Sequence, residues 1–231
     1  MILERRDFAD RAVLAAALAE TVATQLKSAI VERGEASLAL SGGSTPERFL
    51  NVLSQADLDW GKVSVTLVDE RWVPPGDARS NARLVAEALL QNRAAAARFV
   101  PLYSDVACPE DGIPAILSAL TTLPMPFDVV VLGMGADGHT ASFFPGGDPL
   151  AEALDADNPA LLTAMNAPGA GEPRVTFTLA PILASGLIAL HIEGEDKKTV
   201  LEKALVGGPV EDMPVRAVLR SDRPVIVFWA P

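Results

Sequence analysis

The amino-acid sequence predicts an α/β domain in which a mainly parallel sheet is flanked by helices. Helical and strand patterns alternate along the chain, as they do in folds built on parallel sheets. The stretch FDVVVL at 127–132 is an almost unbroken apolar run, which is typical of a strand buried on both faces. At 231 residues and without an internal repeat, a single domain over residues 1–231 is the expected organisation.

The elements follow in order along the chain. A long amphipathic helix is expected from Phe8 to Arg33, with Gly34 placed to end it. Ser44 and Glu47 have the spacing of a capping box, so a second helix is expected to begin there. After a Pro/Gly loop at 74–79, further helices are expected at 81–91 and 195–205. Strands are expected at 36–40, 63–68, 127–132, 174–179, 187–192 and 225–229.

Composition excludes several classes of protein. The formal net charge is -11, and a surface this acidic repels nucleic acid and anionic lipid, although a few local cations can still bind a small anion. Cys108 is the only cysteine, so neither an intrachain disulfide nor a Cys-rich metal site is expected. The N-terminal MILERRDFADRA lacks the apolar core of a signal peptide, and other apolar runs are short. We therefore expect a cytoplasmic protein without a membrane span, either a monomer or a small homo-oligomer.

Polar clusters follow three of the predicted strands: Ser41–Thr45, Asp69–Arg71 and Asp137–Ser142. In open α/β sheets, ligands bind beyond the carboxyl ends of the strands. The three clusters are therefore expected to converge on one site.

The first cluster, SGGST, consists of Ser41, Gly42, Gly43, Ser44 and Thr45 between a strand and a helix. Glycines allow close approach of a ligand to the backbone, and a helix N-terminus offers free N–H groups. The string suits a phosphate or carboxylate, and it equally fits a tight turn before a capped helix. It is not a Walker loop, because no Gly-Lys-Ser/Thr follows.

Charged residues at the other strand ends allow two interpretations. Asp69 and Arg71 flank Glu70 and could position hydroxyls and an anion, or form a surface ion pair. Arg174 opens a strand after a loop. Lys197 lies at a helix start, where a cation opposes the helix dipole, which suggests an anionic ligand there. Ordinary solvated charge is the alternative for both.

The third cluster, GMGADGH, formally matches the dinucleotide fingerprint G-x-G-x-x-G. Asp137 inside the loop would oppose a pyrophosphate, so the loop is interpreted instead as a bend that presents Asp137 and His139. An imidazole that titrates near neutrality can take a proton from water. The other histidine, His191, lies within a strand and is interpreted as structural. No G-x-S-x-G elbow is present, and nothing in the context of Ser142 supports a nucleophilic role for it. Asp137 and His139 could together bind a metal, but with two histidines and one cysteine no dedicated zinc site is expected.

These motifs together resemble the 6-phosphogluconolactonase family. The matching stretches are LALSGGSTPERF, VTLVDERWVPPGDARSNARL, FDVVVLGMGADGHTASFFPG, RVTFTLAPIL and IEGEDKKTVL. They occur in the family's order and extend from about residue 36 to 205. The resemblance implies a Rossmann-like sheet shared with glucosamine-6-phosphate deaminases. It also implies hydrolysis of 6-phospho-D-glucono-1,5-lactone in the oxidative pentose phosphate pathway, without a cofactor.

The resemblance also implies roles for individual residues. His139 would be the general base that activates water, and Asp137 would orient it. The loop Ser41–Thr45, with Arg174 and Lys197, would hold the phosphate. Arg71 would bind either the phosphate or the developing oxyanion, Asp69 would contact sugar hydroxyls, and the role of Glu70 stays open.

Two other functions can be weighed against lactone hydrolysis. The sister deaminases resemble this chain, but their string after DGH is I-A-F-N-E-P, and the glutamate pairs with the histidine. Here the fifth residue after His139 is Phe144, which argues against deamination. A non-catalytic sugar-phosphate sensor would keep the phosphate site and lose the reactive loop, whereas Asp137 and His139 are both present.

Overall fold

A computed structural model describes residues 2–231, and it contains two sheets. The larger sheet has seven strands in the order β1-β10-β9-β6-β2-β3-β5, and every neighbouring pair is parallel. Its strands in chain order are β1 (Ile2–Asp7), β2 (Ala36–Leu40), β3 (Val63–Leu67), β5 (Arg98–Phe99), β6 (Val129–Leu132), β9 (Leu187–Glu193) and β10 (Pro224–Ala230). The predicted parallel sheet is confirmed.

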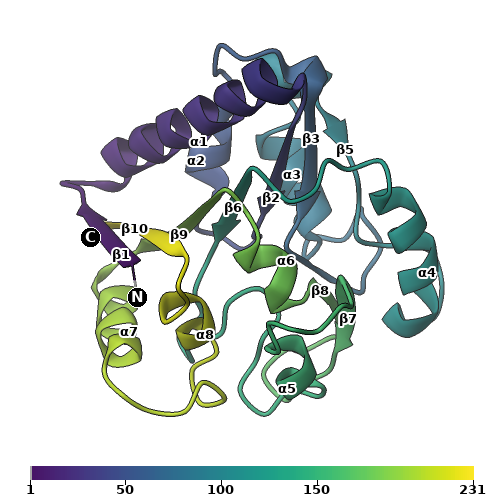
Figure 1. The fold of residues 1–231 in the computed structure, drawn as a ribbon, viewed down its shortest axis with the longest axis vertical. Helices are drawn as coiled ribbons and strands as arrows, with labels where there is room; N and C mark the ends of the chain where they lie inside the picture. Colours follow the sequence, from purple (N-terminus) through teal and green to yellow (C-terminus); the bar gives the residue numbers. More distant parts are fainter. Residues whose placement is uncertain (1) are drawn as a thin grey trace.

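A second, antiparallel sheet of three strands lies beside the first (Figure 1). Its order is β4-β8-β7, with bounds Asp69–Arg71 for β4, Arg174–Phe177 for β8 and Leu162–Met165 for β7. The sequence predicts a strand at 174–179, but it does not predict that this strand pairs with the DER segment. The pairing places Arg71 directly opposite Arg174.

Helices cover both sheets. They are α1 (Arg11–Arg33), α2 (Glu47–Leu53), α3 (Asn81–Ala88), α4 (Pro109–Leu120), α5 (Leu150–Ala153), α6 (Leu179–Leu183), α7 (Glu195–Leu205) and α8 (Val215–Leu219), with 3-10 turns at Trp60–Lys62 and Asn92–Ala96. Helices α1 and α2 pack together on one side of the large sheet, and α4 packs on β7 and β8 (Figure 1). The prediction for 195–205 is confirmed in full, whereas α3 ends three residues before Gln91.

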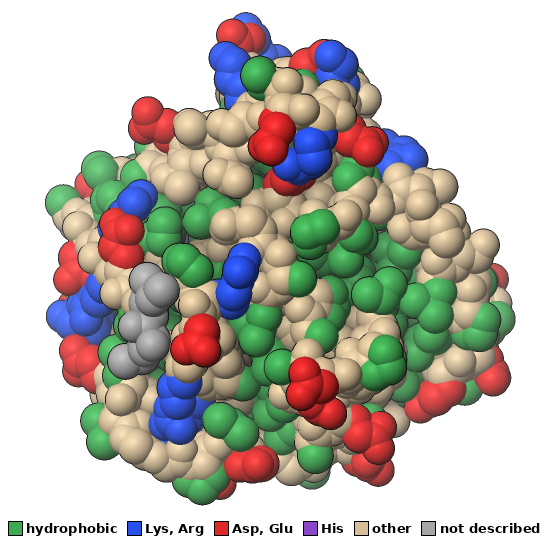
Figure 2. All heavy atoms as spheres, in the orientation of Figure 1, with side chains coloured by type: hydrophobic (Ala, Val, Ile, Leu, Met, Phe, Trp, Pro, Cys, Tyr) green, Lys and Arg blue, Asp and Glu red, His purple; other side chains and the backbone are tan. Residues whose placement is uncertain are grey.

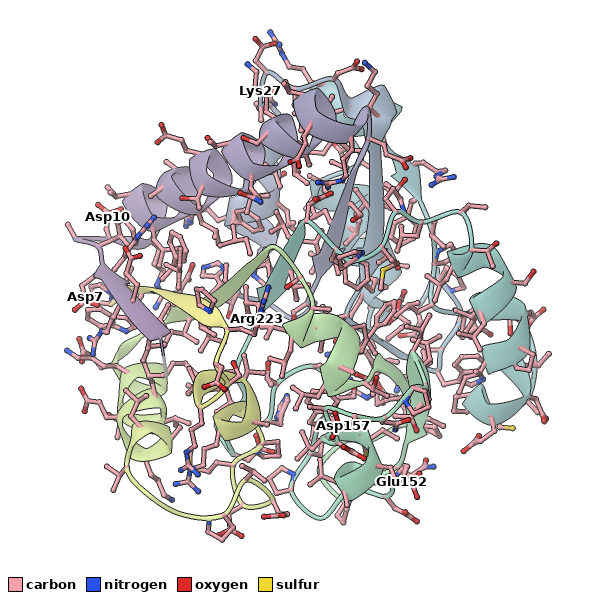
Figure 3. All side chains as sticks on the ribbon, in the orientation of Figure 1. Asp7, Asp10, Lys27, Glu152, Asp157 and Arg223 are labelled. Carbon is pink, nitrogen blue, oxygen red and sulfur yellow. The ribbon has the colours of Figure 1, made fainter. Side chains whose placement is uncertain are left out.

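Helix α1 begins at Arg11 rather than at the expected Phe8. Asp10 is its N-cap, and the Asp10 carboxylate accepts hydrogen bonds from the backbone N–H groups of Ala12 and Val13 (Figure 3). Gly34 ends the helix at φ 85°, as expected, because glycine adopts this left-handed conformation without strain. Its buried residues recur at helical spacing: Leu14, Ala15, Leu18, Ala19, Val22, Leu26 and Ala29.

Among residues 2–231, α1 is the one helix that is long and apolar enough to cross a membrane, with a mean hydropathy of 1.2. No segment that could span a membrane was expected from the sequence, and by length and hydropathy α1 is an exception. In the structure the helix packs on β2, β6 and β10, which is the position of a core helix in an α/β fold.

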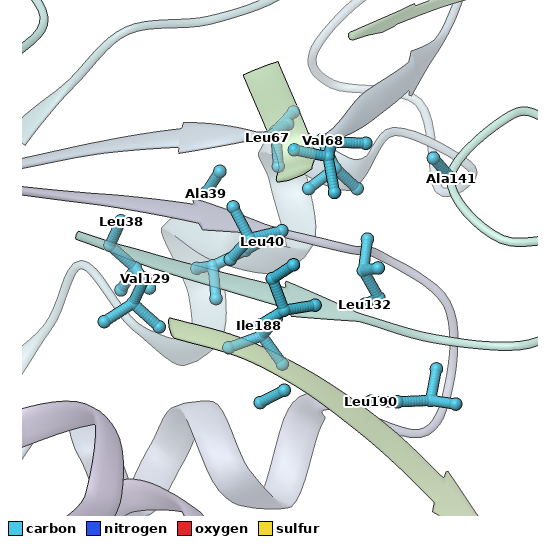
Figure 4. Close-up of a cluster of buried hydrophobic side chains, with 14 of the residues drawn as sticks. Leu38, Ala39, Leu40, Leu67, Val68, Val129, Leu132, Ala141, Ile188 and Leu190 are labelled. Atoms are coloured by element: carbon cyan, nitrogen blue, oxygen red, sulfur yellow. The ribbon is translucent and has the colours of Figure 1, made fainter. Parts of the chain in front are cut away.

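The core lies between the central strands and the helices. Leu38 and Leu40 from β2 pack with Val129 and Leu132 from β6 and with Ile188 and Leu190 from β9 (Figure 4). Strands β2 and β3 are buried along their whole length, because helices and loops cover both faces of the sheet. Charged side chains of both signs are scattered over the face shown in Figure 2.

Candidate active site

A cavity of about 310 Å³ opens at the carboxyl ends of the central strands. Strands β2 and β6 are neighbours, and from them the chain proceeds to opposite edges of the sheet: β2 leads to β3 and β5, and β6 leads toward β9 and β10. Such a switch point is where open α/β sheets bind ligands, because the two loops diverge and leave a crevice. The cavity is lined by every predicted site residue except Asp137: Ser41, Gly42, Gly43, Ser44, Thr45, Asp69, Arg71, His139, Arg174 and Lys197.

The SGGST loop forms one wall of this cavity. Ser41 continues the line of β2, since its N–H donates to the carbonyl of Val131 (2.9 Å) and its Oγ accepts from the N–H of Gly133 (3.2 Å). A Cβ on Gly42 would lie 1.8 Å from Oδ1 of Asn81, so a larger residue there would displace the Asn81 side chain. The loop is therefore anchored to β6 at one end and covered by the start of α3.

The predicted capping box at Ser44 and Glu47 is wrong. Pro46 is the N-cap of α2, and no side chain makes a capping hydrogen bond there. Because the helix begins at Glu47 itself, Ser44 lies two residues before the N-cap and is too far upstream to cap it. Ser44 and Thr45 line the cavity instead.

His139 and Asp137 form a pair beside the cavity. His139 Nδ1 lies 2.6 Å from Asp137 Oδ1, which also accepts the His139 backbone N–H at 3.1 Å. A carboxylate at Nδ1 holds the proton on that nitrogen and leaves the Nε2 lone pair free. The imidazole side chain is 30% exposed, so water can reach it.

The hydrogen bond from His139 lowers the pKa of the Asp137 carboxyl to about 2, with burial opposing the shift. Asp137 is consequently ionised at neutral pH. It can stabilise a positive charge that develops on the imidazole during proton transfer.

The paired strands β4 and β8 bring Asp69, Arg71 and Arg174 together. The Ser142 hydroxyl donates to Asp69 Oδ2 (2.7 Å), and Arg174 Nη1 lies 3.9 Å from the same oxygen. Arg174 Nη2 also donates to the carbonyl of Ala170 (2.6 Å). Asp69 and Arg174 are almost fully buried. Asp69 therefore does not belong to a surface ion pair, and Arg174 is not an ordinary solvated charge. Ser142 is fully buried, and its hydroxyl serves to hold the Asp69 carboxylate.

The cations at the cavity are only partly paired. The Nε atoms of Arg71 and Arg174 are buried, and neither has a hydrogen-bond partner. Burial lowers the pKa of Arg174; Asp69 opposes this shift and the neighbouring Arg71 adds to it. Lys197 lies at the third position of α7, and burial lowers its pKa as well. This arrangement of cationic side chains with unpaired donors can bind an anionic ligand.

Glu70, whose role the sequence leaves open, holds the start of α3. Its buried carboxylate accepts hydrogen bonds from the backbone N–H groups of Arg71, Asn81 and Ala82 (each 2.8 Å) and from the Ser80 hydroxyl (3.1 Å). Burial raises the pKa of Glu70, and these backbone hydrogen bonds oppose the shift. Glu70 does not line the cavity, so it supports the site from behind.

Other side chains of the cavity wall were not predicted as site residues, among them Asn81, Phe144 and His191. Asn81 donates through Nδ2 to the carbonyl of Asp69 (2.9 Å), and Phe144 packs against the imidazole of His139. His191 also lines the cavity, but it is buried and lies 3.1 Å from Glu193 Oε1, in keeping with the structural interpretation. No local pattern distinguishes these residues from core or loop residues, because tertiary contacts alone bring them to the cavity.

Within residues 2–231, no group of three or more His, Cys, Asp or Glu side chains is placed to hold a metal ion.

A family model described as Glucosamine-6-phosphate isomerases/6-phosphogluconolactonase matches residues 9–228. The chain belongs to this family. A family member from Mesorhizobium japonicum, named 6-phosphogluconolactonase, is 57% identical over 225 residues, which cover 97% of this chain and 94% of that protein. A protein of the same name from Rhizobium meliloti is 53% identical, with 97% of each chain covered. The resemblance inferred from the motifs is confirmed.

Solved structures support the same family assignment. The crystal structure of a 6-phosphogluconolactonase from Shewanella baltica has a TM-score of 0.96 at 44% identity and covers 99% of this chain and 98% of that one. A monomeric glucosamine-6-phosphate deaminase has a TM-score of 0.78 at 20% identity, which shows a shared fold. The predicted fold class, shared between lactonases and deaminases, is therefore confirmed.

Proposed function

We propose that this family member hydrolyses 6-phospho-D-glucono-1,5-lactone to 6-phospho-D-gluconate, with His139 as the general base. Relatives named for this activity match almost the whole chain at 57% and 53% identity. The observation that carries the mechanism is the His139–Asp137 pair, which lies beside a cavity that also contains the SGGST loop and three cationic side chains. The reaction is expected to need no cofactor and to take place in the cytoplasm.

The hydrolysis begins with proton transfer from water to Nε2 of His139. The resulting hydroxide adds to the lactone carbonyl carbon and forms a tetrahedral oxyanion. The bond from this carbon to the ring oxygen then breaks, and the ring oxygen takes the proton back from the imidazolium, which leaves a carboxylic acid that ionises. Asp137 stays ionised and stabilises the imidazolium between these steps.

A lactone is already an activated ester, so one positioned base and one partner for the oxyanion are sufficient. We assign the phosphate to the SGGST loop, Arg174 and Lys197. Arg71 binds either this phosphate or the oxyanion, and Asp69 accepts hydrogen bonds from sugar hydroxyls. Binding energy from the phosphate, far from the reacting carbon, holds the carbonyl near His139.

The test is hydrolysis of freshly generated lactone, coupled to the NADP-dependent dehydrogenase that consumes the product, with spontaneous opening subtracted. Wild type is expected to accelerate the reaction. His139→Ala is expected to lose about 10²–10⁴-fold in kcat, because the base is gone, while the Kd for 6-phosphogluconate changes little. Near-normal turnover by His139→Ala would exclude the general-base role. No acceleration by wild type would exclude the lactonase activity and direct the search to glucosamine 6-phosphate.

A further inference from the structure

The side chain of Phe144 contacts both the proposed base and one of the proposed phosphate ligands. Its ring centroid lies 4.3 Å from that of His139, and the two planes are inclined by 32°. The guanidinium carbon of Arg174 lies 5.4 Å from the same phenyl centroid. Phe144 is 3% exposed and forms part of the cavity wall. One aromatic ring therefore adjoins two groups that carry positive charge during the reaction.

The backbone of the reactive loop makes this arrangement possible. A tight turn joins Thr140 to Phe143, where the Phe143 N–H donates to the Thr140 carbonyl (3.0 Å). Ala141 within this turn has φ 49°, a conformation that non-glycine residues seldom adopt. The turn folds residue 144 back onto residue 139. Phe143, in contrast, is fully buried in the hydrophobic core and does not line the cavity.

The face of a phenyl ring carries partial negative charge and attracts a cation whose centre lies within about 6 Å. Arg174 is permanently charged, and His139 becomes charged when it accepts the proton from water. A ring at this position therefore stabilises the protonated imidazole more than the neutral one, and the same ring lies against the Arg174 guanidinium.

We propose that Phe144 is a positioning residue that sets the geometry between His139 and Arg174 and stabilises the imidazolium formed during hydrolysis. This inference rests on the proposed function. Phe144 acts through these two side chains and is not itself a catalytic residue. The charged group hydrogen-bonded to His139 is Asp137, and the Asp137 carboxylate in turn opposes the lowering of the Lys197 pKa. Neither Asp137 nor Lys197 is altered by a substitution at Phe144.

The chain offers a matched control in the adjacent residue. Phe144→Leu and Phe143→Leu each remove one buried phenyl ring, but only the first removes a ring that adjoins His139. Phe144→Leu is expected to lower kcat about three- to tenfold, to raise KM, and to move the acidic limb of the kcat/KM profile to lower pH by about half a unit. Phe143→Leu is expected to lower the stability of the fold, to leave the acidic limb at its wild-type pH, and to change kcat by less than about twofold. Phe144→Tyr, which keeps the aromatic face, is expected to restore the wild-type limb.

A measurement without substrate separates this inference from the proposed function. The two histidines of the chain allow an NMR titration in which His139 reports on the site and His191 is the internal reference. In Phe144→Leu the titration midpoint of the His139 ring is expected to fall by about half a pH unit relative to wild type, with the His191 midpoint unchanged.

Equal His139 midpoints in wild type, Phe144→Leu and Phe143→Leu would overturn the inference, even if the lactone is hydrolysed. If Phe144→Leu fails to fold, the same midpoint is measured in Phe144→Met, which also lacks the aromatic face. If wild type does not hydrolyse the lactone but the His139 midpoint still falls in Phe144→Leu, the proposed function is refuted, whereas the effect of Phe144 on His139 is upheld.

Discussion

At the scale of single residues, Gly135 leaves the space that the His139–Asp137 pair occupies. A Cβ at Gly135 would lie 2.1 Å from His139 Nδ1 and 2.5 Å from Asp137 Oδ1. Gly135→Ala is therefore expected to displace the imidazole and to lower kcat about 10²-fold, since catalysis is sensitive to shifts of about 1 Å. Gly133→Ala is the control, because its Cβ would meet only the Ser41 Cβ at 4.0 Å. Equal losses in the coupled assay for both variants would contradict this account of Gly135.

The low pKa of Asp137 predicts a pH-dependent contribution to stability. The pKa falls from its ordinary value of 3.8 to about 2 in the folded protein, so the contribution is complete above pH 3.8 and is lost as pH falls toward 2. Asp137 is 44% exposed and screened by solvent, so the contribution is expected to be below about 1 kcal/mol. Urea unfolding at pH 5 and pH 3 should show Asp137→Asn less stable than wild type at pH 5, with a smaller difference at pH 3. Asp157→Asn, at an exposed position, should show no such trend. A stability difference between Asp137→Asn and wild type that grows as pH falls would contradict the assignment.

At the scale of elements, the Glu70 carboxylate joins β4 to the start of α3. Glu70→Ala would leave its four buried donors without this acceptor and is expected to destabilise the fold by about 3–5 kcal/mol. Glu70→Gln keeps one acceptor oxygen and should cost less. Glu87→Gln removes only an exposed pair with Arg83 on the same helix and should change the urea midpoint little. A Glu70→Ala midpoint close to that of Glu87→Gln would show that α3 does not depend on this carboxylate.

The elements with strong periodicity could be predicted from sequence, and those without it could not. Strands such as 36–40 are apolar because both faces are buried, so their signal is local. Strand β1 is an edge strand with the sequence ILERRD, and its charged residues gave no strand pattern. Helix α4 contains Pro114 in its interior, where the local sequence predicts a break and not a helix.

Some features of the candidate site could likewise be predicted from local sequence, and others could not. The SGGST and DGH loops could be located because glycine and polar residues follow buried strands. The cross-strand contact of Arg71 with Arg174 could not, because it depends on pairing between segments about 100 residues apart. The role of Glu70 was also hidden, since nothing in DER indicates which of its two carboxylates faces the cavity.

At the scale of the whole molecule, the site joins distant parts of one chain. Its lining residues extend from Leu40 to Lys197 and come from the ends of β2, β6 and β9, from the small sheet and from the start of α7. A ligand that bridges these parts binds the folded chain and not the unfolded one, so it must stabilise the molecule as a unit.

Product binding should therefore raise the thermal midpoint of the entire protein. At a 6-phosphogluconate concentration of 100 times Kd, the expected stabilisation is about 2.7 kcal/mol, or about 5–10 °C for a chain of this size. Gluconate, which lacks the phosphate, should give almost no shift of the thermal midpoint at the same concentration.

Arg174→Ala should lose more than half of the shift produced by 6-phosphogluconate, because a charged hydrogen bond to phosphate contributes about 1.5–3 kcal/mol. Lys197→Ala should lose part of it, whereas Lys198→Ala should keep it, since the Lys198 ammonium pairs with Glu195 and lies over the Trp229 ring. Equal shifts with gluconate and 6-phosphogluconate would mean that the cations of this cavity do not bind the phosphate, and the substrate would then have to be held through its hydroxyls alone.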